Sequence, residues 1–253
     1  MTTPKPTILL TGANGGLGSA FVTAFLKSPQ SATHHALYTV RSPSTVPDLQ
    51  AILKSAPSTH TYDILPLDLS SLESVRTLAE DVNSKVAKGE LGPIKSLVLN
   101  AGWQDANAET LKPRIFTKEG YEGHFGINYL ANFLLVLLLL QSVNKEEGRI
   151  VLVSSYTHDG LDKQNDGLAY YTSNTGEFKE LYKGTDELVK GKEWSDDGWK
   201  AGMRRYGASK TCLVLFMFVP FHSFLHSTLT NLTKGMNSNA ASLPTQHSPT
   251  SQS

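Results

Sequence analysis

A glycine-rich segment near the amino terminus, Thr11–Gly18 with the sequence TGANGGLG, constrains the fold of this chain more than any other stretch. It follows the apolar run Thr7–Leu10 and precedes Ser19–Leu26, whose apolar residues recur at helical spacing. Glycines let the backbone approach a ligand closely, and a helix N-terminus presents free N–H groups and a partial positive charge. The segment therefore predicts a strand–turn–helix unit that cradles a pyrophosphate. The residues predicted to contact this ligand are Gly12, Asn14, Gly16, Leu17 and Gly18.

Strand-like and helix-like segments alternate along most of the chain. Apolar runs rich in Val, Ile and Leu predict strands at Thr7–Leu10, Ala36–Val40, Asp63–Leu67, Ile94–Leu99 and Arg149–Val153. Helices are predicted over 19–26, over 46–56, from an N-cap at Ser70 with Glu73 at capping-box spacing, from about Thr117 to Val143, and from Trp199. Continuous apolar strands that alternate with helices are typical of a parallel sheet covered on both faces. The sequence thus predicts an α/β fold with a doubly wound parallel sheet, in which Pro66 places the third strand at an edge.

Small and polar residues follow the predicted strands. Such a sheet binds its ligand beyond the carboxyl ends of its strands, because these ends meet at one edge. We therefore expect the residues after the second, third and fourth strands to join the glycine-rich turn in one ligand site. These residues are Arg41, Asp68, Leu69, Asn100, Ala101 and Gly102, and Ser155 follows the fifth strand.

Tyr206 and Lys210 are four residues apart on a predicted helix, so their side chains share one face. A tyrosine with the ordinary pKa of about 10 is a poor base at neutral pH. A nearby ammonium lowers that pKa, which would make Tyr206 a general acid/base, and Lys210 would also hold ribose hydroxyls of a cofactor. Ser155 would stabilise a carbonyl oxygen by a hydrogen bond. The alternative is that Tyr206 and Lys210 lie on a solvated helix face.

Asn128 lies inside the long predicted helix, where it would hold a water that connects Lys210 to solvent, or would be an ordinary buried amide. The histidines show no metal-ligand spacing, so we predict no metal site and assign them structural roles. Those considered are His34, His35, His60, His124 and His158.

In combination, these motifs resemble the short-chain dehydrogenase/reductase family. The resemblance covers about residues 7–218 and is carried, in chain order, by Thr11–Gly18, Asp68-Leu69, Leu99–Gly102, Asn128, Ser155 and Tyr206-Gly-Ala-Ser-Lys210. It implies a Rossmann fold, a bound nicotinamide nucleotide, and hydride transfer between this cofactor and an alcohol or carbonyl carbon. It also implies that Ser155, not Ser154, is catalytic, and that the protein is a homodimer. The long gap between Ser155 and Tyr206 resembles the retinol-dehydrogenase-like and fungal branches.

The residues after the second strand favour NADP(H) over NAD(H). An NAD enzyme generally has an acidic residue near this strand end, which binds the ribose hydroxyls. Here Arg41 and Ser42 follow the strand, and they suit a 2′-phosphate.

Composition excludes several classes of function. The 253-residue chain has 23 basic and 23 acidic side chains, so no net charge attracts nucleic acid. A single cysteine, Cys212, fits a reducing compartment. We find no signal peptide, and the apolar runs Tyr129–Leu140 and Cys212–Leu232 are too short or too polar to span a membrane. We therefore expect a soluble, cytoplasmic protein, and the family resemblance implies that its partner is a small alcohol or carbonyl compound.

The domain prediction is a Rossmann domain over 1–218 and an irregular or disordered tail over 219–253. Within the domain, 156–205 is polar and is expected to form a long excursion over the mouth of the site, with a floppy surface loop as the alternative. Beyond Pro220 the tail has little apolar periodicity, so we expect it to lack the family's last strands, which would leave the fifth strand as an exposed edge. One hypothesis is that 219–234 is translated intron and that the remainder is out of frame. Two other functions stay open: a nucleotide-binding regulator without turnover, and a defective family product.

Overall fold

The computed structural model describes residues 3–104, 115–160, 162–168, 184–191 and 199–218. The chain divides into two compact units, Met1–Val214 and Leu215–Ser253. The first unit contains the sheet and the candidate site. In the second unit, the described residues are those that end the last helix. The predicted tail, 219–253, lies outside the described residues.

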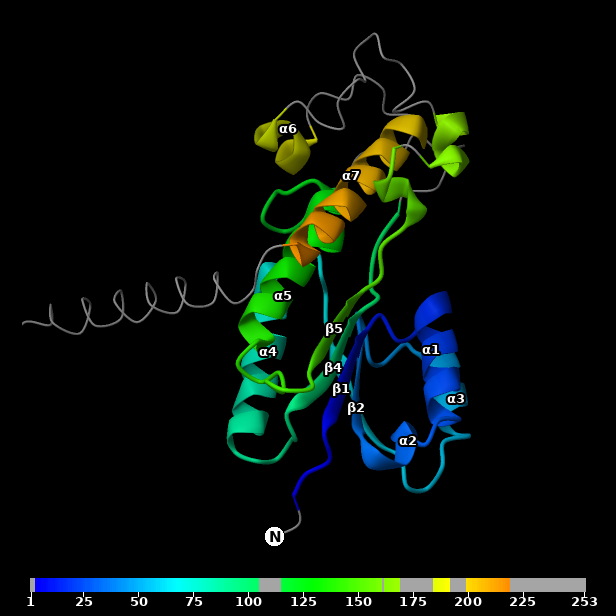
Figure 1. The fold of residues 1–253 in the computed structure, drawn as a ribbon, viewed down its shortest axis with the longest axis vertical. Helices are drawn as coiled ribbons and strands as arrows, with labels where there is room; N and C mark the ends of the chain where they lie inside the picture. The colour runs from blue at the N-terminus through cyan, green and yellow to red at the C-terminus, as the bar shows by residue number, and fades with distance from the viewer. Residues whose placement is uncertain (1–2, 105–114, 161, 169–183, 192–198, 219–253) are drawn as a thin grey trace, which may run out of the picture. The chain divides into compact units, whose positions relative to one another are not determined.

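A parallel sheet with the strand order β3-β2-β1-β4-β5 forms the centre of the first unit (Figure 1). The strands are β1 Thr7–Thr11, β2 His35–Val40, β3 Thr61–Pro66, β4 Ile94–Leu99 and β5 Arg149–Leu152. From β1, the chain adds β2 and β3 on one side and β4 and β5 on the other, so the order reverses between β1 and β4. The predicted doubly wound parallel sheet is confirmed, and β3, which contains Pro66, lies at an edge as expected. Among the described strands, β5 forms the other edge.

Helices follow the strands and cover the sheet, with α1 and α3 on one side and α4 and α5 on the other (Figure 1). The helical segments are α1 Gly16–Leu26, α2 Gln30–Thr33, α3 Pro47–Leu53, α4 Leu72–Ala87, the π-helix η1 His124–Leu130, α5 Ala131–Leu139, the 3₁₀ segments η2 Tyr156–His158 and η3 Lys163–Leu168, α6 Thr185–Lys190 and α7 Trp199–Met217. The start of α7 agrees with the sequence prediction.

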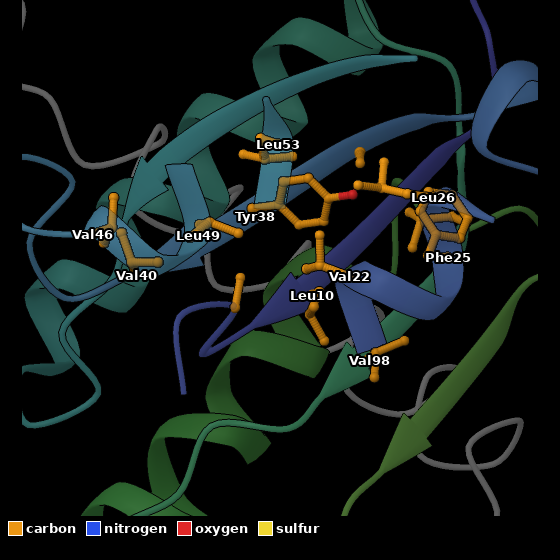
Figure 2. Packing of buried hydrophobic residues seen from close by; sticks show 13 residues of the cluster. Leu10, Val22, Phe25, Leu26, Tyr38, Val40, Val46, Leu49, Leu53 and Val98 are labelled. Atoms are coloured by element: carbon orange, nitrogen blue, oxygen red, sulfur yellow. The ribbon is translucent and has the colours of Figure 1, made fainter. Parts of the chain in front are cut away.

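The core between α1, α3 and the sheet consists of side chains that the sequence places on apolar faces (Figure 2). Leu10 and Tyr38 from the strands are fully buried against Val22 of α1 and Leu49 of α3. Burying one such side chain contributes roughly 1.5–3 kcal/mol, so this layer holds the strand ends in place.

The long helix predicted from about Thr117 to Val143 is wrong at both ends. Before it, the chain turns back at Gly120, which has a φ of 85°, and Phe116 pairs with Glu122 in an antiparallel bridge. Residues that make a tight turn and a bridge cannot be helical, so the first helical residue is His124. At the other end, Val143 pairs with Ile94 beside β4, which ends the helix at Leu139.

The predicted start of the helix after the third strand also needs correction. The N-cap of α4 is Ser71, whose hydroxyl accepts a hydrogen bond from the Ser74 N–H, and not Ser70. Ser70 instead donates its hydroxyl proton to Asp68, which satisfies that side chain outside the helix. The predicted excursion over 156–205 includes the start of α7, which begins at Trp199 as predicted, and its place over the mouth of the site stays a prediction. Its parts at 161, 169–183 and 192–198 lie outside the described residues.

Candidate active site

A cavity of about 790 Å³ opens beyond the carboxyl ends of β1, β2 and β4, where the strand order reverses. Eleven of the residues predicted to bind a cofactor line this cavity: Gly12, Asn14, Gly16, Leu17, Gly18, Arg41, Asp68, Leu69, Asn100, Ala101 and Gly102. Sequence reasoning missed several lining residues, among them Thr45, Trp103 and Ile127. These three residues belong to no sequence motif. They line the cavity because of the path that their loop or helix takes in the fold.

The glycine-rich turn is shaped by contacts that a side chain would prevent. Gly12 has a φ of +69°, which favours glycine. A Cβ at Gly18 would lie 2.0 Å from the Gly12 carbonyl oxygen, whereas a Cβ at Gly16 would meet nothing within 4 Å. Helix α1 begins after Gly15 without a side-chain cap. The N–H groups of its first turn are therefore available to an anion in the cavity.

Asn100 ties the end of β4 to this turn. Its amide nitrogen donates to the carbonyl oxygens of Thr11, at 3.0 Å, and Gly12, at 3.3 Å. In return, the Thr11 hydroxyl oxygen accepts hydrogen bonds from the backbone N–H groups of Asn100 and Ala101. The two segments that line the centre of the cavity thus form one unit.

Charged side chains occupy the end of the cavity beside β2 and β3. Burial would raise the pKa of Asp68, but two hydrogen bonds from Ser70 and the positive charges of Arg41 and Lys118 outweigh it, so that pKa is lowered. The Lys118 ammonium nitrogen lies 4.0 Å from an Asp68 carboxylate oxygen. Asp68 is therefore ionised, and it accompanies the cation Arg41 in the cavity wall.

The structure brings the predicted Ser155, Tyr206 and Lys210 together. The Ser155 side chain lies near enough to Tyr206 to act on its pKa, and the Lys210 ammonium nitrogen lies 5.5 Å from the centre of the Tyr206 ring. Lys210 donates its hydrogen bond to the Val153 carbonyl oxygen at 2.9 Å. A Cβ at Gly102 would lie 3.5 Å from the same nitrogen, so Lys210 lies next to the lining residue Gly102, but neither Lys210 nor Tyr206 is among the residues that line the cavity.

The expectation that Lys210 lowers the pKa of Tyr206 is wrong for this structure. Burial raises the pKa of Tyr206, and the nearby Ser155 side chain opposes that effect only in part. Burial also lowers the pKa of Lys210, to about 8. The reason is that the Lys210 nitrogen bonds to a backbone carbonyl and not to the phenol.

Asn128 lies in η1, where it joins the loop after β4 to α7. Its amide oxygen accepts from the Trp103 N–H at 2.7 Å, and its amide nitrogen donates to the Trp103 carbonyl oxygen and the Ser209 hydroxyl. The side chain therefore has a positioning role that the sequence did not predict. The water between Asn128 and Lys210 stays a prediction.

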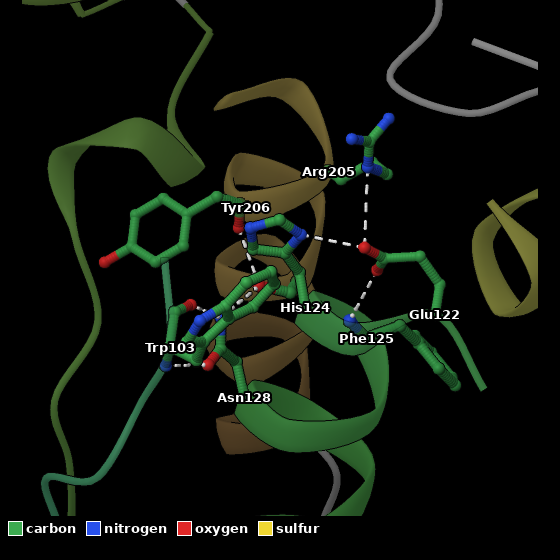
Figure 3. A network of polar contacts seen from close by, with 8 residues as sticks. Trp103, Glu122, His124, Phe125, Asn128, Arg205 and Tyr206 are labelled. Carbon is green, nitrogen blue, oxygen red and sulfur yellow. Dashed lines mark hydrogen bonds and ion pairs between the residues drawn. The ribbon is translucent and has the colours of Figure 1, made fainter. Parts of the chain in front are cut away.

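Three further side chains beside Tyr206 were missed or assigned only a structural role (Figure 3). The ring of His124 contacts the Tyr206 ring edge to face, with centroids 6.1 Å apart, and Nδ1 of His124 lies 2.8 Å from a Glu122 carboxylate oxygen. Arg205 approaches the same oxygen at 3.4 Å. The one available signal is that His124 precedes Asn128 by four residues, on one face of the helix.

No group of three or more potential metal-ligating side chains is found in the described part of the chain. None of the helices described here is long and apolar enough to cross a membrane.

Comparison with known proteins gives a consistent result. The family model for short chain dehydrogenases matches residues 6–179. The short-chain dehydrogenase iccH of Talaromyces variabilis is 37% identical over 235 residues, which cover 83% of this chain and 62% of that protein. The protochlorophyllide reductase of Cucumis sativus is 31% identical over 229 residues, which cover 89% of this chain and 53% of that protein. The chain thus spans between half and two thirds of the length of these relatives.

Solved structures show the same fold. A protein of Mycobacterium paratuberculosis matches with a TM-score of 0.56 at 23% identity, covering 92% of this chain and 65% of that one. An NADPH-bound carbonyl reductase from chicken fatty liver matches with a TM-score of 0.54 at 19% identity, covering 85% of this chain and 69% of that one. At these identities, the likeness concerns the fold alone.

Proposed function

The chain belongs to the short-chain dehydrogenase family of oxidoreductases, and we propose that it transfers a hydride between NADP(H) and an alcohol or carbonyl compound. One observation carries this proposal. Gly102 lines the cavity and would place a Cβ 3.5 Å from Lys210, whose nitrogen in turn lies 5.5 Å from the Tyr206 ring. Lys210 therefore connects the cavity lining at Gly102 to Tyr206, the side chain proposed to transfer a proton.

The shape and donors of the cavity fit a dinucleotide. The uncapped start of α1 and the glycine-rich turn would hold the pyrophosphate, because N–H groups of a helix N-terminus bind anions. The lining residues proposed to form the rest of the binding site are Arg41, Asp68, Leu69, Asn100, Ala101 and Gly102. Tyr206 and Lys210, which are not among the lining residues, are proposed to contact the cofactor beyond Gly102. Bound there, the nicotinamide nucleotide would donate or accept the hydride.

The proton chemistry falls to Tyr206. In the reducing direction, hydride adds to the carbonyl carbon and the Tyr206 hydroxyl gives its proton to the carbonyl oxygen, which leaves an alcohol and a phenolate. Ser155 would donate a hydrogen bond to the same oxygen as negative charge develops on it. Lys210 would hold the ribose hydroxyls of the cofactor, and Asn128 would hold a water through which solvent returns the proton to Tyr206.

Arg41 supports NADP(H) over NAD(H) in this proposal. It follows β2 and lines the cavity with Ser42 and Thr45, so a cation and two hydroxyl groups are available to a 2′-phosphate. A guanidinium binds phosphate through paired N–H donors. Several structural neighbours were solved with NADPH or NADP bound, which agrees with this preference.

The proposal is tested in two steps. NADPH fluorescence on mixing with the protein measures cofactor binding, and a screen of carbonyl and alcohol compounds that follows NADPH absorbance measures turnover. We expect both. Binding without turnover of any compound would favour the non-catalytic nucleotide-binding protein, and absence of binding would favour a defective product of the family.

A further inference from the structure

A buried cluster of ionisable side chains lies beside Tyr206 (Figure 3). Glu122 and His124 are 2% and 1% exposed, and Arg205 is 7% exposed. Glu122 lies two residues before His124, which begins the π-helical segment, and Arg205 precedes Tyr206 in α7. Burying three ionisable side chains costs free energy unless they are paired, so each of them is expected to have a partner in the cluster.

The carboxylate of Glu122 contacts three groups. One oxygen accepts a hydrogen bond from Nδ1 of His124 at 2.8 Å and lies 3.4 Å from Nε of Arg205. The other oxygen accepts the Phe125 N–H at 2.9 Å. The backbone N–H of Glu122 donates to the Val189 carbonyl oxygen in α6. One residue therefore connects the start of η1, the turn of α7 that carries Tyr206, and α6.

Glu122 is a charged carboxylate in this cluster. Its burial would raise its pKa, but the hydrogen bond and charge of His124 and the Phe125 N–H outweigh burial, so the pKa is lowered. A buried charge with several partners fixes the geometry of those partners, because moving any of them leaves it unsatisfied.

His124 transmits this geometry to Tyr206. Its ring meets the Tyr206 ring at an interplanar angle of 72°, and it packs on Trp103 with centroids 4.4 Å apart. Trp103 is in turn held by both of its backbone groups to Asn128. The Glu122–His124 pair therefore constrains the position of the Tyr206 ring in addition to α7.

We infer that Glu122 and His124 are positioning residues, which hold the Tyr206 ring so that its hydroxyl stays beside Ser155. This inference rests on the proposed role of Tyr206 as acid/base. A misplacement of about 1 Å at a reacting group lowers turnover on the order of a hundredfold, so loss of the pair is expected to reduce kcat without weakening cofactor binding.

The test uses Glu122→Gln, which keeps the size of the side chain and an oxygen for the Phe125 N–H but removes the charge that His124 and Arg205 contact. The matched control is Glu147→Gln, which removes the charge of an exposed carboxylate paired with Lys95. A second variant, His124→Phe, keeps an aromatic ring and removes the Nδ1 donor.

Three quantities are measured for each protein. They are kcat with NADPH and 9,10-phenanthrenequinone as a carbonyl probe, the dissociation constant of NADPH, and the titration of Tyr206. The titration is followed by ultraviolet absorbance, as the difference between each protein and the same protein carrying Tyr206→Phe.

For Glu122→Gln and His124→Phe, we expect kcat to fall roughly 10- to 100-fold while the NADPH dissociation constant changes by less than about twofold. We also expect the Tyr206 titration to move down toward the ordinary value near 10, because a loosened ring gains water. The control should match the unaltered protein in all three.

An unchanged Tyr206 titration in both variants would overturn the inference, as would a loss of NADPH binding as large as the loss of kcat. An unaltered protein that binds NADPH but turns over no carbonyl compound would refute the proposed function instead. In that case the titration alone decides the positioning role.

Discussion

The ammonium nitrogen of Lys210 lies 5.5 Å from the centre of the Tyr206 ring, while its hydrogen bond goes to the carbonyl oxygen of Val153. Val153 follows β5, so this bond fixes α7 against the carboxyl end of the strand that leads to Ser155. Lys210 thus connects α7 to the backbone that follows β5, and its ammonium group lies over the Tyr206 ring.

Replacing Tyr206 by Phe removes the hydroxyl and keeps the ring that packs on His124. If Tyr206 is the acid/base, turnover should fall by ~10²–10⁴-fold, which is the usual contribution of proton transfer. NADPH binding, measured by fluorescence titration, should change little. Tyr62→Phe, on the edge strand β3, is the control. A loss under about threefold would exclude Tyr206 from the proton transfer.

Arg41→Ala tests the cofactor preference. We expect it to weaken NADPH binding by about 1.5–3 kcal/mol, the scale of a charged hydrogen bond, and to leave NADH binding nearly unchanged. Isothermal titration with each cofactor measures both values. Arg149→Ala removes an exposed guanidinium on β5 and serves as the control. Equal losses for the two cofactors would mean that Arg41 has a structural role.

The glycine-rich turn offers a matched pair of substitutions. Gly18→Ala would place a Cβ 2.0 Å from the Gly12 carbonyl oxygen, so it should distort the turn, lower the melting temperature and abolish NADPH binding. Gly16→Ala places a Cβ in open space at the start of α1 and should leave the melting temperature unchanged or raised, since alanine favours helix. Thermal unfolding without cofactor separates them. Similar melting temperatures for the two variants would contradict the described turn.

The stability of the protein should depend on His60 in mild acid. Nδ1 of this buried ring faces the Ser31 carbonyl oxygen at 3.0 Å and must carry the proton, so Nε2 accepts from the Tyr38 hydroxyl. Burial lowers the pKa of His60 below its unfolded value, and the nearby His35 and Lys5 charges add to this effect. The unfolded chain therefore binds more protons, and the stability contribution is present above about pH 6.5 and is lost as the pH falls toward the lower folded pKa.

The measurement is urea unfolding between about pH 5 and pH 7.5, a range that brackets the ordinary histidine pKa. His60→Gln should flatten the pH dependence of the unfolding free energy, whereas the control His34→Gln, in the segment after α2, should leave it as in the unaltered protein. A profile for His60→Gln that parallels the unaltered protein would show that other groups dominate in this range.

The sequence by itself determined the parallel sheet, the glycine-rich turn and the residues at the strand ends. Each of these depends on local information. Apolar runs such as Ile94–Leu99 define strands to the residue, and the absence of a Cβ at Gly12 and Gly18 is a property of the residue itself. Topology then brings successive strand ends to one edge, which is why eleven predicted residues line one cavity.

The partners of the polar side chains were decided only by the tertiary structure. The bond from Lys210 to Val153 and the two bonds between Asn128 and Trp103 join residues that are far apart in the chain. The start of η1 at His124 likewise depends on the turn at Gly120 and the Phe116–Glu122 bridge, which cannot be predicted from helical periodicity. A buried polar group must find a partner wherever the packed elements place one, so its role is a property of the assembled fold.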